Sequence, residues 1–327
     1  MTLNPFTGKK VGVWVSLETT RGVKKVPIEY WMPWTDNTFF DHANVESDAG
    51  VVDTLVDSIN SEVTKQWSEW TIGWQVYPNG IWFFLKALLG ACESEANEDS
   101  DEAYNHIFTL LESNTHPTLT VWTNTPIWGQ AFPLAMIESM DFNAEVGWKF
   151  TVSINLKARK GETQTHTVAY TSESGFVANM LKVYLANNIA WLDNAANICL
   201  QSLTISIKKE VKDIECLSSI DPIDYMNSSF SIEWSMELIF EDNTYKNDFL
   251  SWNAHAMRIL AEDTKHPIDD GVYPTFMMDL SKVQYTDWTP AFAVDDIVKQ
   301  TVAFKGHYDV NTRKAIEIQL INTQESY

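Results

Sequence analysis

A strict alternation of side chains over residues 229–238 limits the possible folds more than any other feature of the sequence. Every second residue is apolar, and the residues between them are serine or glutamate. A period of two over ten residues predicts a β-strand with one buried face and one face in water. The apolar side chains are Phe230, Ile232, Trp234, Met236 and Leu238, and the polar ones are Ser229, Ser231, Glu233, Ser235 and Glu237.

The same alternation recurs in other parts of the chain, at residues 69–76, 150–157, 203–208 and 316–320. Strands that bury only one face are typical of antiparallel sheets, whereas the strands of parallel sheets are usually buried on both faces. The sequence therefore predicts a mainly β fold built from antiparallel sheets.

Two segments predict helices. The first follows the turn at residues 77–80, is apolar nearly all round and ends at Gly90, so we expect it to be covered on several sides. The second follows residues 241–243, where large apolar side chains recur at intervals of three and four. These side chains are Tyr245, Phe249, Trp252, Ala256 and Ile259.

The two helices indicate an internal repeat, because each follows a long alternating strand and a polar turn. Further along, residues 136–143 and 148–158 resemble residues 278–287 and 299–309, respectively. Repeats of this kind predict two copies of one β-rich unit. We place the first unit at residues 1–165 and the second at residues 166–327.

Residues 27–57 lie outside the repeat and combine acidic side chains with large aromatic ones. The aromatic side chains are Trp31, Trp34, Phe39 and Phe40. Burying each of them stabilises a protein by ~1.5–3 kcal/mol, so leaving all four in water is unfavourable. We expect this segment to be an arm that packs against a neighbouring subunit; folding back onto its own domain is the alternative.

No group of residues in the sequence indicates catalysis. The seven histidines are scattered without metal-ligand spacing, and neither a nucleophile elbow nor a phosphate-binding glycine loop is present. The three cysteines lie far apart, which argues against a zinc site or a disulfide framework. We predict a non-enzymatic protein with no catalytic residue, cofactor or metal.

The charge of the chain narrows the possible partners. Its 44 acidic and 23 basic residues give a formal net charge of -21, which argues against a protein that grips nucleic acid through phosphate contacts. The polar strand faces are rich in Ser, Thr, Asn, Gln and Glu, and would suit the wall of a polar channel. No apolar run approaches the ~20 residues that span a bilayer, so we expect no membrane partner.

Several segments, taken in order, carry a resemblance to a known family. They are residues 11–20, the Tyr77-Pro78-Asn79-Gly80 turn with residues 84–90, and residues 104–109, 117–121, 203–209, 238–242, 299–308 and 315–322. Together they resemble the major tail tube proteins of long-tailed (siphovirus-type) bacteriophages, in the version with two tube domains in one chain.

This resemblance implies a β-sandwich with a flanking α-helix, repeated twice, whose sheets join into a continuous inner β-barrel on oligomerisation. One-domain members form hexameric rings, so a two-domain chain is expected to form trimeric rings. The rings would be assembled in the bacterial host cytoplasm and stack into the tube of a virion tail. Double-stranded DNA would pass through this tube during genome ejection without specific binding. Tape-measure and tail-completion or tip proteins would be further partners.

The polar face of residues 229–237 would then line the lumen. Two other functions stay open. One is the inner tube of a contractile tail or of a secretion needle, which uses the same fold. The other is a Trp-rich carbohydrate-binding β-sandwich, in which Trp67, Trp70 and Trp74 would form the sugar-stacking platform.

Overall fold

The computed structural model describes residues 5–26, 28–48, 55–292, 294–295 and 297–325. These residues form eighteen β-strands and two α-helices, and all the strands connect into one sheet system in which every pairing is antiparallel. The prediction of a mainly β, antiparallel fold is confirmed.

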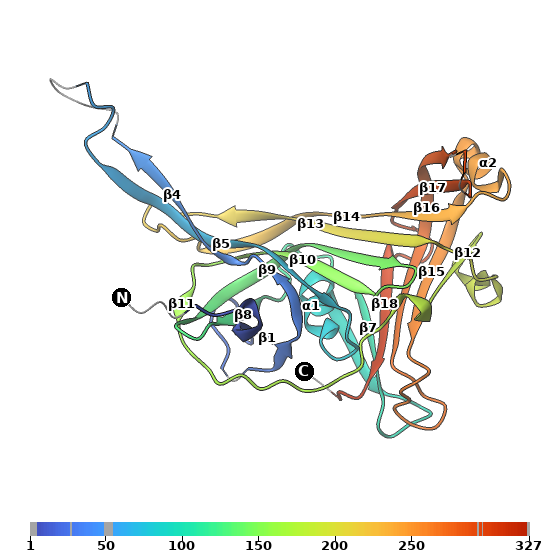
Figure 1. The fold of residues 1–327 in the computed structure, drawn as a ribbon, viewed down its shortest axis with the longest axis horizontal. Coiled ribbons are helices and arrows are strands. Elements are labelled where there is room, and N and C mark those ends of the chain that lie inside the picture. The colour runs from blue at the N-terminus through green and yellow to red at the C-terminus, as the bar shows by residue number, and fades with distance from the viewer. Residues whose placement is uncertain (1–4, 27, 49–54, 293, 296, 326–327) are drawn as a thin grey trace.

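The largest layer is a sheet of long strands that runs through both halves of the chain (Figure 1). We call it the main sheet. Its strand order is β4–β5–β10–β9–β13–β14–β17–β16. The strands are β4 (Phe40–Ser47), β5 (Ser61–Gln75), β9 (Gly129–Glu145), β10 (Thr151–Ala158), β13 (Ser202–Ile214), β14 (Asp224–Ile239), β16 (Thr275–Ala291) and β17 (Lys299–Gly306). Strand β3 (Trp34–Asn37) continues the edge position of β4 along β5.

The shorter strands build the layers behind the main sheet. Strands β9 and β16 are long enough to leave it, and their first residues pair with the shorter strands. The strands around β9 are β1 (Gly12–Leu17), β2 (Tyr30–Met32), β8 (Leu119–Asn124) and β11 (Glu162–Thr163). Those that continue from β16 are β12 (Leu181–Ala186), β15 (Ala254–Glu262), β18 (Ile316–Asn322), β7 (Tyr104–Leu110) and β6 (Gly90–Ala96).

Helix α1 (Ile81–Leu89) lies in the core between these layers. Every residue of it except Lys86 is buried, and the Phe84 ring lies 4.6 Å from the Trp74 ring of β5, centroid to centroid. The expectation of a helix covered on several sides is confirmed. Gly90 follows it with a φ of 92°, a conformation that glycine adopts without strain.

Helix α2 (Thr244–Ser251) is shorter than the sequence pattern predicts. Its chain reverses at Trp252, which has left-handed backbone angles, and Ala256 and Ile259 lie on β15 instead of on the helix. The apolar spacing of three and four therefore came from two different elements. On the helix itself, only Tyr245 and Phe249 pack against the core.

The two halves repeat the same strand order. In the first half, β4–β5–β10–β9 lie side by side, and in the second half β13–β14–β17–β16 do so in the same sequence. Strands β9 and β13 pair along residues 139–145 and 202–208, so the repeats share one uninterrupted sheet. The division into domains at residues 165 and 166 stays a prediction, because the main sheet runs through both halves.

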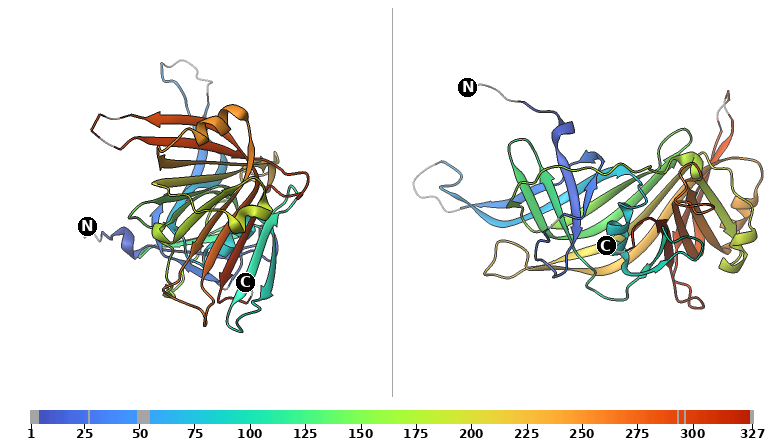
Figure 2. Two further views of the ribbon diagram at one scale, coloured as in Figure 1. Left: turned by 90° about the vertical axis from the view of Figure 1, so that its right-hand side faces the viewer. Right: turned by 90° about the horizontal axis from the view of Figure 1, so that it is seen from below.

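An extended segment, residues 164–177, connects the halves along the outside of the first one (Figures 1 and 2). Its His166 ring packs edge-on against Trp122, with ring centroids 4.8 Å apart. Further along, Glu173 accepts hydrogen bonds from the Tyr30 hydroxyl and from the Asn79 amide. This connecting segment is therefore fastened to the first half.

Candidate functional site

The polar face of the main sheet is the most extended feature that the sequence singled out. On β14 the alternation is as predicted: Ile232, Trp234, Met236 and Leu238 are all at most 3 % exposed. Ser229 and Glu233 are exposed, and Ser231, Ser235 and Glu237 are half-buried. All five predicted polar residues thus share one face of the sheet, opposite the core.

The polar face continues across strands from both halves of the chain. Glu233 lies opposite Ser206 of β13 on one side and opposite Lys305 of β17 on the other. Ser206 in turn lies opposite Asp141 of β9, and the row continues through Ser153 of β10 to Gly73 of β5. A neighbouring row runs through Ala303, Ser235, Thr204, Asn143, Thr151 and Gln75.

Short hydrogen bonds between strands tie these small polar side chains to one another. The Ser206 hydroxyl donates to Asp141, and the Thr204 hydroxyl donates to Asn143 Oδ1 at 3.1 Å. On the next strand pair, Asn155 Nδ2 donates to the Ser139 hydroxyl at 2.6 Å. Part of the hydrogen-bonding capacity of this face is therefore used within the sheet, so fewer of its polar groups are available to bind a ligand.

Lysines lie beside the acidic residues of this face, which the sequence analysis did not foresee. Lys299 Nζ lies 2.9 Å from Glu237 Oε1, and Lys208 Nζ lies 3.8 Å from Glu233 Oε2. These lysines come from β17 and β13, so their position depends on strand pairing. The four arginines of the chain, Arg21, Arg159, Arg258 and Arg313, all lie outside the strands of the main sheet.

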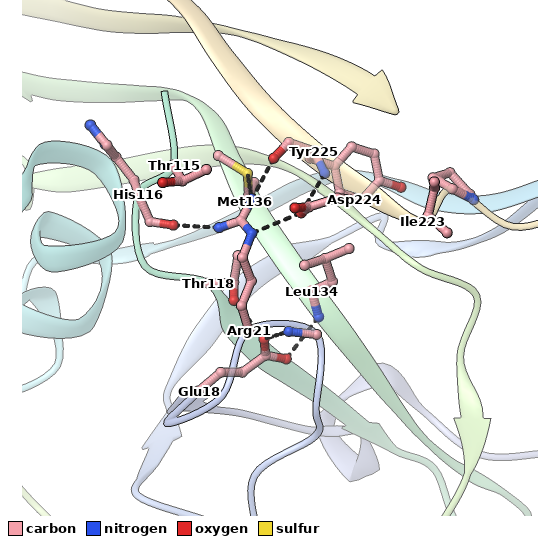
Figure 3. A network of polar contacts seen from close by, with 12 residues as sticks. Glu18, Arg21, Thr115, His116, Thr118, Leu134, Met136, Ile223, Asp224 and Tyr225 are labelled. Atoms are coloured by element: carbon pink, nitrogen blue, oxygen red, sulfur yellow. Dashed lines mark hydrogen bonds and ion pairs between the residues drawn. The ribbon is translucent and has the colours of Figure 1, made fainter. Parts of the chain in front are cut away.

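Two of those arginines, Arg21 and Arg159, hold the second half against the first, and Figure 3 shows the contacts of Arg21. Arg21 donates to Asp224 Oδ1 at 2.8 Å, to the His116 carbonyl at 2.6 Å and to the Tyr225 carbonyl. Arg159 donates to the carbonyl of Pro222 at 2.9 Å and to that of Ile223. The start of β14 is thus held by side chains from more than 60 residues away, and we call this contact the arginine clamp.

A buried carboxylate fixes the loop that carries Arg21. Glu18 is 8 % exposed and accepts hydrogen bonds from the backbone amides of Gly22 and Leu134 and from the hydroxyls of Thr118 and Thr120. Burial raises the pKa of Glu18, although these four hydrogen bonds oppose the rise. Because Gly22 directly follows Arg21, the Glu18 network positions the arginine clamp.

A second contact between the halves lies at the carboxyl end of α1. The ammonium group of Lys209, from β13, donates to the Ala87 carbonyl at 3.0 Å, and His116 Nδ1 lies 2.8 Å from the Leu88 carbonyl. These carbonyls are among the last four of the helix, which have no partner within it. Burial and the nearby Arg21 lower the pKa of Lys209 to about 7, and burial lowers the pKa of His116.

The four aromatic residues of the expected arm do not stay together. Phe39 is 5 % exposed and packs against the Phe132 ring, while Trp34 is half-buried and donates its indole N–H to the Val11 carbonyl at 2.9 Å. Trp31 contacts the buried Trp14, with ring centroids 4.2 Å apart. These three therefore lie against their own half of the chain, where they gain the burial that motivated the expectation. Only Phe40 remains 50 % exposed.

Among the described residues of 27–57, the part that projects is the outer portion of the β4–β5 hairpin (Figures 1 and 2). Residue 27 and residues 49–54 lie outside the described residues. The described part of the hairpin carries exposed aliphatic side chains. These are Val45, Leu55, Val56, Ile59 and Val63, and each is at least 42 % exposed.

Other site chemistry receives no support from the described residues. Within them, no group of three or more His, Cys, Asp or Glu side chains could hold a metal ion, and no helix is long and apolar enough to cross a membrane. For the sugar-stacking alternative, Trp74 is 1 % exposed and lies in the core, so it cannot offer its ring to a ligand. The side chain of Trp70 is outside the described part.

Comparisons with known proteins point to one family. A family model described as phage tail tube protein matches residues 8–306, which is nearly the whole chain. A search among curated proteins gives no match.

Proposed function

The chain belongs to the phage tail tube protein family, and we propose that three copies of it form a ring that stacks with others into a tube for double-stranded DNA. Membership of the family makes it a structural component of a phage tail. Ring formation, stacking and DNA conduction are the parts that we propose. Contacts with a tape-measure protein inside the tube and with tail-completion or tip proteins at its ends follow from the same proposal.

The observation that carries this proposal is the main sheet itself. Each chain provides two runs of four strands in the same order, already joined by the pairing of β9 with β13. One face of this sheet is polar and the other faces the core. Six such runs, from three chains, would close a barrel of 24 strands with the polar face inside.

The dimensions of such a barrel suit a DNA duplex. With ~4.8 Å between strands and a tilt of ~40°, 24 strands give a backbone diameter of about 48 Å. Side chains of ~5 Å on each wall would leave roughly 38 Å, which exceeds the ~20 Å width of a duplex. A DNA duplex could therefore pass through the barrel with free space between it and the wall.

The chemistry of the polar face suits passage better than binding. DNA-binding proteins grip phosphates with lysine and arginine, and each such contact adds to affinity at low salt. Here Lys208 and Lys299 pair with Glu233 and Glu237, Lys305 is exposed opposite Glu233, and the arginines lie elsewhere. Together with the net charge of -21, this arrangement would weaken adhesion of phosphate.

Adding a cation to the wall should slow DNA ejection. Ser235 lies in the middle of the polar face, between Thr204 and Ala303, and makes no ion pair that a substitution would break. In Ser235→Lys phage we expect normal tube length and slower ejection, with the delay growing as salt is lowered. The measurement is the rate of DNA release triggered in vitro at several salt concentrations.

Ser235→Glu is the matched control, because it adds a side chain of similar length with the opposite charge. It should eject at the unmodified rate or faster. Equal ejection rates for the two variants at low salt would show that this face does not meet the DNA.

A further inference from the structure

The two runs of four strands correspond residue by residue, down to an irregularity in the pairing. In the first half, β10 pairs with β9 with a bulge at Glu138, between the pairs Asn155–Ser139 and Leu156–Ile137. In the second half, β17 pairs with β16 with a bulge at Thr286, between the pairs Ala303–Asp287 and Phe304–Tyr285. Each of these residues in the second half stands 148 positions after its counterpart in the first.

The remaining strands of each run can be matched through their partners. Gly73 pairs with Ser153, and Glu237 pairs with Thr301, the counterpart of Ser153, so Gly73 and Glu237 are equivalent. Glu69 is then equivalent to Glu233, 164 positions later. Their partners on the next strand, Phe40 and Ser206, are equivalent in turn.

This correspondence makes the β9–β13 ladder a template for a second ladder. Within the chain, β9 of the first run pairs with β13 of the second. By equivalence, β16 ends the second run as β9 ends the first, and β4 begins the first run as β13 begins the second. In the described residues, the last part of β16 has no strand on its outer side, and neither do β3 and β4. Such unpaired edges favour pairing with another chain.

We propose that β16 of one protomer pairs with the β3–β4 edge of the next in the register of the internal ladder. The proposal rests on the ring formation proposed above and adds its contacts. Asp141 lies opposite Ser206 within the chain, so Thr289 should lie opposite Phe40 of the next protomer. Ser139 lies opposite Lys208, so Asp287 should lie opposite His42 of the next protomer.

The backbone of both edges is oriented for such a ladder. Phe240 donates to the Val298 carbonyl, so the even-numbered residues of β17 form backbone hydrogen bonds with β14, and the odd-numbered residues form them with β16. The odd-numbered residues of β17 lie opposite Asp287, Thr289 and Ala291 of β16. The peptide groups between these, at Trp288 and Pro290, therefore face the free edge. On the other side, Thr38 donates to the Thr71 carbonyl, which turns the peptide groups of Phe39 and Asp41 to the free edge, where the Phe39 amide is bonded to Asn37 Oδ1 at 3.0 Å.

Pro290 makes the proposed ladder weaker than its internal counterpart. Phe142 is the equivalent of Pro290 and lies opposite Ile205, where its amide is available to the ladder. Proline has no amide hydrogen, and it is found in sheets mainly where that hydrogen would face an edge. The ladder between protomers should therefore lack one hydrogen bond, which suits a contact that forms only during assembly.

Engineered disulfides test the register directly. In a background with Cys92→Ala, Cys199→Ser and Cys216→Ser, the pair Thr289→Cys with Phe40→Cys should link neighbouring protomers into covalent trimers on oxidation of assembled tubes. Both positions are equivalent to a non-hydrogen-bonded pair, whose short Cα separation a disulfide accepts. The readout is a non-reducing gel, and Asp287→Cys with His42→Cys provides an independent second pair.

The matched control is Asp141→Cys with Ser206→Cys, which should form the equivalent bond within one chain and no trimers. Thr289→Cys with Thr38→Cys, a register shifted by two residues, should link poorly. If tubes form but the shifted pair links better than both proposed pairs, the register is wrong while the proposed function stands. If the unmodified chain forms neither rings nor tubes under electron microscopy, the proposed function fails and the register fails with it.

Discussion

Replacing Arg21 with methionine should lower the free energy of unfolding by about 3 kcal/mol. Arg21 is the donor to the Asp224 carboxylate and to two backbone carbonyls at the contact between the halves. Without it, these acceptors stay partly buried and lose their charged donor, and the Asp224 carboxylate keeps only the Tyr225 amide among the described residues, while methionine keeps most of the apolar contact of the side chain. Urea unfolding of the unassembled protein, followed by tryptophan fluorescence, measures the loss.

Arg313→Met is the matched control, since it makes the same chemical change at an exposed position. It should change the free energy of unfolding by less than about 0.5 kcal/mol. If the two variants unfold at the same urea concentration, the arginine clamp does not stabilise the fold.

Shortening the β4–β5 hairpin should abolish tubes while leaving rings. Replacing residues 45–64 with Asn-Gly removes the exposed aliphatic side chains of the hairpin end and joins Asn44 to Lys65. These two residues are paired across the hairpin, and the register of the Thr38–Thr71 hydrogen bond makes them a hydrogen-bonded pair, which a two-residue turn can close. The edge residues Phe40 and His42 remain, so protomers can still pair side by side. We expect rings that do not stack, because the projecting hairpin is the part placed to reach another ring. Negative-stain electron microscopy distinguishes rings from tubes.

Ser47→Ala with Ser61→Ala changes a polar pair on the same hairpin and should form tubes normally. Normal tubes from the shortened chain would refute the stacking role. Monomers that do not form rings would instead mean that the hairpin end contributes to the contact between protomers.

The strands that bury one face could be predicted because their pattern is local. Trp234 and Met236 point inward and Glu233 and Ser235 outward through the geometry of a single strand, whatever lies beside it. Helix α1 was predictable for a similar reason. The length of helix α2 could not be predicted, since the chain reverses at Trp252 and the last residues of the apolar pattern, Ala256 and Ile259, lie on β15.

Features that depend on strand pairing could not be read from the sequence. Lys208 and Lys299 reach Glu233 and Glu237 through the register of β13 and β17 with β14. The arginine clamp joins Arg21 to Asp224, 203 positions apart, and no local pattern marks either residue.

The internal repeat was predicted, but its alignment needed correction. The sequence matched the end of β9 with residues 278–287, whereas the shared bulge places the equivalent of Glu138 at Thr286 and that of Asp141 at Thr289. The copies differ so much in side chains that backbone irregularities identify equivalent positions better than residue types do. The aromatic residues 31, 34 and 39 lie against their own half of the chain, and their role in a contact between subunits stays a prediction, because the need for burial does not specify which surface provides it.

A reconstruction of the assembled tube would show whether one chain provides two of the six equivalent parts of a ring. We expect three chains per ring and an inner barrel of 24 strands, with Glu233 and Glu237 facing the lumen. Six chains per ring, or a polar face turned to the outside of the tube, would contradict this expectation.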